Sequence, residues 1–92
     1  MESNAPRSAL IKALATLGQR PPAELAGLAG GPALRQALDV GGERVEIEML
    51  VAWDDASHDA VRITGHAHGP EGMHGHVQES LVARVRDADR PH

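Results

Sequence analysis

Apolar and polar residues alternate with two different periods, and the change of period divides the chain into two halves. Near the start, apolar residues recur at the spacing of an amphipathic helix: Leu10, Ile11, Leu14 and Leu17. This stripe predicts a helix over residues 8–17. Gly18 is suited to end it, and Pro21 and Pro22 follow.

Two shorter helices are expected next. Pro22 suits the first position of a helix because its φ is already helical, and Leu25 and Leu28 would share one side of that helix. Gly30 and Gly31 end it. Pro32 then opens a third helical segment, which carries Leu34, Ala37 and Leu38 and closes at Gly41-Gly42.

The second half of the chain has the period of two that is typical of β-strands. Residues 45–53 and 60–68 alternate between apolar and polar positions, which predicts two strands joined by a polar turn. Residues 76–85 form a third run after a turn over 69–73. Glu79 interrupts the apolar alternation of this run, where we expect a bend or a bulge.

These elements predict an α+β fold in which two or three short N-terminal helices pack on a three-stranded antiparallel β-meander. We expect residues 1–7 to form a flexible arm and residues 87–92 a polar tail. Residues 8–86 then form one domain, with a helical half over 8–40 and a sheet half over 43–86. The odd-numbered apolar residues of the first two strands should face the helices, and the even-numbered ones solvent.

Composition adds that the core is modest. The chain has 92 residues, with one Trp and no Phe or Tyr, so its core must consist of smaller aliphatic side chains. We therefore expect a homodimer, whose interface would supply further apolar burial, and a protein partner is an alternative source.

Charge and cysteine content exclude several functions. The chain has no cysteine, which excludes disulfides, a thiol nucleophile and iron–sulfur clusters. The net charge of −4 and the scattered arginines argue against nucleic-acid binding. We find neither a signal peptide nor an apolar run long enough for a membrane span, and we expect a soluble, cytoplasmic protein.

The histidines are the candidate functional residues. Four of the six lie close together, at His66, His68, His74 and His76. All four are even-numbered, so a hairpin would place them on the outward face. A loop over 69–73 would set His68 opposite His74 and His66 opposite His76, close enough for two imidazoles to share one metal.

The first strand adds carboxylates to this face. If Val51 pairs with Ile63, Glu48 lies beside His66 and Glu46 beside His68. Two histidines and a carboxylate are the ligands of many catalytic zinc and non-haem iron sites. The six residues therefore form a candidate site for zinc or another divalent transition metal. A register shift of two residues would move the glutamates relative to the histidines.

Other interpretations remain open. The histidines could form an ordinary polar or interface face, or a proton-linked switch. The function expected is that of a small soluble accessory or binding protein, acting through the histidine-rich face or an edge strand. No catalytic residue is identified, which disfavours an enzyme. Three helices followed by a hairpin also permit a winged-helix DNA-binding protein, with Arg35 and Gln36 as base contacts.

Overall fold

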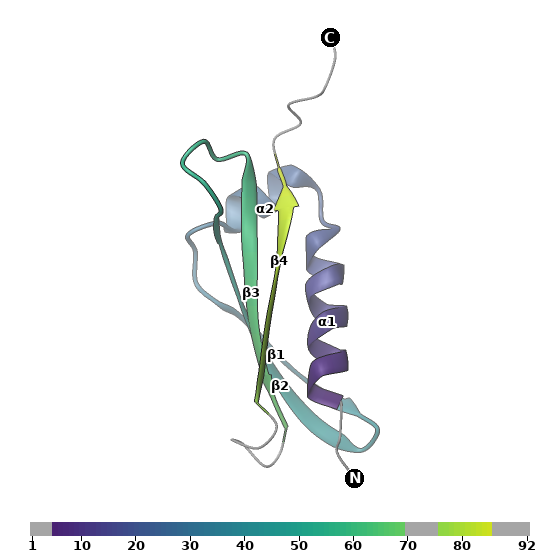
Figure 1. The fold of residues 1–92 in the computed structure, drawn as a ribbon. Coiled ribbons are helices and arrows are strands. Elements are labelled where there is room, and N and C mark those ends of the chain that lie inside the picture. Colours follow the sequence, from purple (N-terminus) through teal and green to yellow (C-terminus); the bar gives the residue numbers. More distant parts are fainter. Residues whose placement is uncertain (1–4, 70–75, 86–92) are drawn as a thin grey trace.

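The computed structural model describes residues 5–69 and 76–85, which form an α+β fold of two layers (Figure 1). The elements follow in the order α1 (Ala5–Gly18), α2 (Pro22–Leu28), β1 (Leu34–Val40), β2 (Glu43–Trp53), β3 (Ala60–His68) and β4 (Val77–Arg84). The four strands form one antiparallel sheet in the order β1-β2-β3-β4. Helix α1 packs along one face of this sheet, which we call the inner face; the opposite one is the outer face.

Helix α1 confirms the first helical stripe with two differences. It begins at Ala5, three residues before the expected start. Leu10, Leu14 and Leu17 are buried against the sheet, whereas Ile11 is 51% exposed. One turn of helix advances by about 3.6 residues, so Leu10, Leu14 and Leu17 lie on one side, and Ile11 is turned about 100° from Leu10.

Helix α2 forms where Pro22 predicted it, with Leu25 buried and Leu28 half-buried. Beyond its end, the Gly30 N–H donates a hydrogen bond of 2.9 Å to the carbonyl oxygen of Val51. This bond ties the connection between α2 and β1 to the C-terminal part of β2, just beyond its pairing with β1. Among the described residues, neither helix is long and apolar enough to cross a membrane.

The third predicted helix is wrong, because residues 34–40 form strand β1. This strand pairs with β2 from Leu34 opposite Met49 to Val40 opposite Glu43. Gly41 and Gly42 join the two strands with φ values of 58° and 85°. Positive φ at both central residues is the feature of a two-residue type I′ hairpin, which suits the twist of paired strands. The sheet therefore has four strands instead of three.

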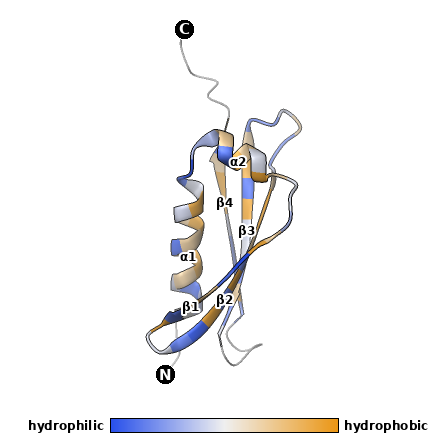
Figure 2. Cartoon of the chain, turned by 180° about the vertical axis from the view of Figure 1, so that it is seen from behind, coloured by the Kyte–Doolittle hydropathy of each residue, from blue (hydrophilic) through white to orange (hydrophobic). Residues whose placement is uncertain are grey.

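The core lies between α1 and the inner face. Figure 2 shows apolar and polar residues alternating along the strands, as the period of two predicted. The buried side chains of the sheet come from alternate positions of the two central strands: Val45, Ile47, Met49, Val51, Val61, Ile63 and Ala67. These strands pair with Val51 opposite Ile63, which confirms the predicted register.

Strand β4 runs without the bulge expected at Glu79. Its pairing with β3 is continuous from Ala60 opposite Arg84 to Ala67 opposite Val77. Glu79 lies on the inner parity and forms an ion pair with Arg7 of α1. The carboxylate breaks the apolar alternation because it meets a cation of the covering helix, and the strand itself stays regular.

Candidate metal site on the outer face of the sheet

The outer face carries the glutamates and histidines in the rows that the sequence predicted. Glu48 of β2 lies opposite His66 of β3, and Glu46 lies opposite His68. Side chains alternate across a sheet, and these four residues are on the parity that faces away from α1. The four residues therefore share one surface.

The predicted pairing across the β3–β4 hairpin is wrong by two residues. His66 lies opposite Gln78 and not opposite His76. A shift of two residues leaves every side chain on its own face, so the apolar pattern could not distinguish the two registers. His74, the expected partner of His68, lies outside the described residues.

His66 and His76 nevertheless meet, because they are diagonal neighbours on the outer face. Nδ1 of His66 lies 3.4 Å from Nε2 of His76. The ring centroids are 5.4 Å apart, and the ring planes differ by 25°. Diagonal pairs in a sheet are separated by about 7–8 Å at the backbone, a distance that two imidazoles can bridge. This contact brings together two of the six predicted ligands.

Both glutamates are paired with arginines. Arg35 Nη2 of β1 lies 3.1 Å from Glu48 Oε2, and Arg44 Nε lies 3.4 Å from Glu46 Oε2. These pairs are exposed, so each contributes only about 0–1 kcal/mol to stability. The sequence analysis missed Arg35 as a neighbour of Glu48 because residues 34–38 were assigned to a helix.

No group of three or more His, Asp and Glu side chains within residues 5–69 and 76–85 is arranged to hold a metal ion. The distance between the two imidazole nitrogens is nevertheless suitable for a shared metal. With bonds of about 2.0–2.1 Å and a tetrahedral angle, two nitrogen ligands lie about 3.3–3.4 Å apart. Each ring would rotate about 35° from the line between the nitrogens to direct its lone pair at the ion.

The surface around these residues is hollowed. A depression of about 540 Å³ is lined by residues of β1, β2 and β3, including Arg35, Arg44, Glu46, Glu48, His66 and His68. Its side chains combine cations, carboxylates and imidazoles within one open basin. A bound ion here would have polar neighbours of both signs.

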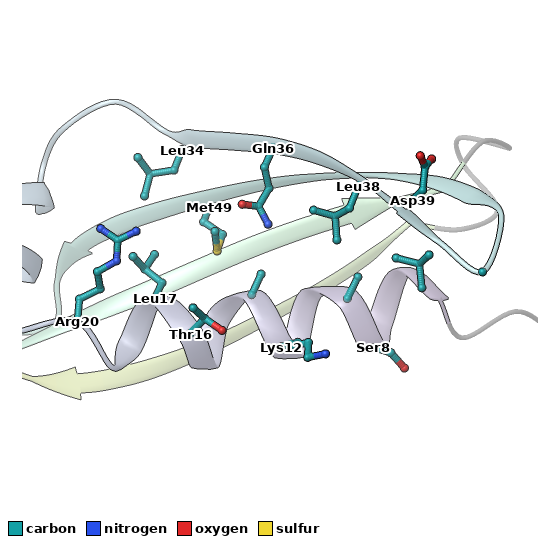
Figure 3. Close-up of a pocket in the computed structure, with 14 residues that line it drawn as sticks. Ser8, Lys12, Thr16, Leu17, Arg20, Leu34, Gln36, Leu38, Asp39 and Met49 are labelled. Carbon is teal, nitrogen blue, oxygen red and sulfur yellow. The ribbon is translucent and has the colours of Figure 1, made fainter.

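Strand β1 occupies the residues that the winged-helix alternative assigned to a DNA-recognition helix. Arg35 lies on the outer side of a strand, whereas Gln36 points toward α1 (Figure 3). The two residues therefore lie on opposite faces of the sheet. They cannot read adjacent bases as two residues of one recognition helix do.

A further histidine lies in the turn between β2 and β3. His58 stacks on Trp53 with ring centroids 4.3 Å apart and planes 7° from parallel. The φ of His58 is 62°, in the left-handed region, and this conformation turns the imidazole back over the indole. The sequence contained no signal for this contact, because it depends on the backbone of the turn.

Comparison with known proteins identifies no relative of this chain. No protein family matches the chain, and no curated protein or solved structure matches it significantly.

Proposed function

We propose that this chain is a small binding protein that takes up a divalent transition metal on its outer face. The supporting observation is the contact between His66 Nδ1 and His76 Nε2 at 3.4 Å. Two imidazoles at this separation suit zinc, copper or nickel, for which imidazole is a favourable ligand. No residue is assigned a catalytic role, and we expect the protein to work in the cytosol.

Glu48 is the candidate third ligand because it lies opposite His66 in the neighbouring strand. To reach a metal it must leave Arg35, and giving up an exposed ion pair costs about 0–1 kcal/mol. His68 and Glu46 form the adjacent row, and His74 belongs to the same predicted ligand set. Water would complete the coordination of a site with fewer protein ligands.

The test is a calorimetric titration of chelator-treated protein with zinc and with nickel, accompanied by thermal melts. We expect near-unit stoichiometry, micromolar affinity and a raised Tm. The variant His66→Ala/His76→Ala should lose at least about tenfold in affinity while melting as a folded protein. His58→Asn, which changes a histidine outside the outer face, should bind as the parent protein does. Equal metal affinity in all three proteins would refute the proposal.

A second candidate function is protein association through an edge strand. Strands β1 and β4 each pair on one side only within the described residues, and Val82 of β4 is 46% exposed. Unpaired strand edges can accept a strand from another chain, and a second copy would form the expected homodimer. Sedimentation over a wide concentration range tests this. A constant monomer mass would rule out the homodimer.

A further inference from the structure

The inner face is wider than the single long helix that covers it. Strands are spaced about 4.7–4.9 Å apart, so a four-stranded sheet measures roughly 15 Å between its outer strand axes. A helix with its side chains is about 10–12 Å across. Helix α1 packs on β2, β3 and β4, and the inner side of β1 is left beside it.

The uncovered strip is a groove between α1 and β1, with a volume of about 740 Å³ (Figure 3). Leu34 and Leu38 point from β1 toward the helix, and Met49 of β2 lies between them and Leu17. The wall formed by α1 presents small side chains, Ala9, Ala13 and Thr16. Small residues on a helix surface allow a second helix to approach closely, at the lower end of the usual 8–10 Å separation.

The side chains that line the groove include two cations and one carboxylate, although the chain as a whole carries a net charge of −4. The cations are Lys12 of α1 and Arg20, which lies two residues beyond the end of α1, and α1 contains no acidic residue. Lys12 forms no ion pair with the described residues, and Arg20 is 3.7 Å from Glu24. Asp39 is the one acidic residue among those lining the groove, and it points away from α1.

We infer that this groove binds an amphipathic α-helix of a partner protein, with acidic residues along the flank that faces α1. The apolar ridge of that helix packs on Leu34, Leu38 and Met49. Lys12 lies within α1 and Arg20 just beyond its end, and both line the side of the groove formed by the helix. The partner helix therefore carries acidic groups on the flank that faces these two cations.

The charge pattern disfavours a second copy of this chain as the occupant. Helix α1 of another molecule would bring its own Arg7 and Lys12 to the groove, with no acidic residue in return. Like charges placed together at an interface are unfavourable. This inference does not depend on the proposed metal site, which lies on the opposite face of the sheet.

The test uses a displayed library of helical peptides with a constant leucine ridge and a variable flank. Selection on the wild-type protein should enrich peptides with Asp or Glu residues on the variable flank. The best of these, made synthetically, is then measured by fluorescence anisotropy. Lys12→Glu should weaken binding about 5- to 10-fold, because an attraction at the rim becomes a repulsion. Arg84→Glu, the same change of charge on the exposed part of β4, should leave affinity within about twofold.

A charge-swapped peptide completes the design. With its acidic groups replaced by lysine, the peptide should bind Lys12→Glu more tightly than it binds the wild-type protein. Amide shifts in ¹⁵N spectra should fall on α1 and β1 and not on the outer face. Three results would overturn the inference: no enrichment, equal affinity for Lys12→Glu and Arg84→Glu, or a wild-type dimer that the peptide dissociates.

Discussion

Leu10 of α1 lies directly over the backbone of Gly65 in β3. A Cβ atom added to Gly65 would be 2.6 Å from Leu10 Cδ1 and 3.2 Å from Leu14 Cδ2. Leu10 is fully buried, so its side chain has little room to move. The absence of a side chain at Gly65 is thus what lets the helix lie close to the sheet, a frequent role of glycine inside a strand.

We predict that Gly65→Ala destabilises the fold by about 1–3 kcal/mol, as overpacking of a core does. Urea unfolding followed by circular dichroism measures this. Gly27→Ala is the matched control. A Cβ on Gly27 would meet nothing within 4 Å, and alanine in a helix should stabilise by up to about 1 kcal/mol. In a double-mutant cycle, Leu10→Ala should remove part of the cost of Gly65→Ala. Additive effects would contradict the proposed contact.

The hairpin between β1 and β2 should tolerate asparagine at its first turn position and penalise larger residues. Both Gly41 and Gly42 have positive φ. Gly41→Asn should change the free energy of unfolding by less than about 0.5 kcal/mol, since Asn-Gly favours this turn. Gly41→Val should cost about 1–2 kcal/mol, because a β-branched residue is strained there. Thermal melts compare the two variants, and equal losses would argue against the turn geometry.

The stack of His58 on Trp53 should be visible in fluorescence. Trp53 is the only tryptophan, so its emission reports on this one environment. The imidazole covers one face of the indole, with ring centroids 4.3 Å apart. His58→Asn removes this ring but keeps a residue that accepts positive φ, so the emission maximum of Trp53 should shift to longer wavelength as water reaches the indole. An unchanged emission spectrum would contradict the stack.

Arg35 and Glu48 should have opposite effects on metal affinity if the carboxylate is a ligand. Arg35→Gln frees Glu48 from its ion pair and should strengthen zinc binding by up to about fivefold. Glu48→Gln removes the charged ligand and should weaken binding. Isothermal titration of both variants gives the signs. Unchanged affinity in both would leave the two histidines as the binding groups and exclude Glu48.

Binding should also weaken as the pH falls, because an imidazole must be unprotonated to coordinate a metal. Titrations at about pH 7.5 and about pH 5.5 compare the affinities. If affinity were independent of pH, histidine coordination would be excluded.

The central strands β2 and β3 were predictable because one of their faces must be apolar to pack on α1 and the other must be polar to face solvent. The bounds of β3 and the pairing of Val51 with Ile63 follow from the alternation of apolar and polar residues. A one-residue slip in register would turn the apolar side chains to solvent. The positions of Glu46 and Glu48 beside the histidines follow from the same register. Strand β4 was predicted to within one residue at each end.

Strand β1 and the hairpin register were not predictable in the same way. Residues 34–40 are half covered, so Arg35, Ala37 and Asp39 are exposed and the apolar pattern is too sparse to separate strand from helix. The pair Gly41-Gly42 was the available signal for a hairpin, but glycine also ends helices, so the pair alone did not distinguish the two structures. The sequence placed His66 beside His76, but their diagonal arrangement depends on a two-residue shift that no alternation pattern records.

The ion pair between Arg7 and Glu79 has a consequence for how the chain is made. Of the described elements, helix α1 is synthesised first, yet it packs on β4, which is synthesised last. The buried leucines of α1 therefore lack part of the sheet surface on which they pack until β4 has been translated. These are Leu10, Leu14 and Leu17. Such long-range closure slows folding relative to chains with local contacts. During synthesis this apolar stripe is accessible to chaperones. The fold can be completed only after the β4 segment has emerged from the ribosome.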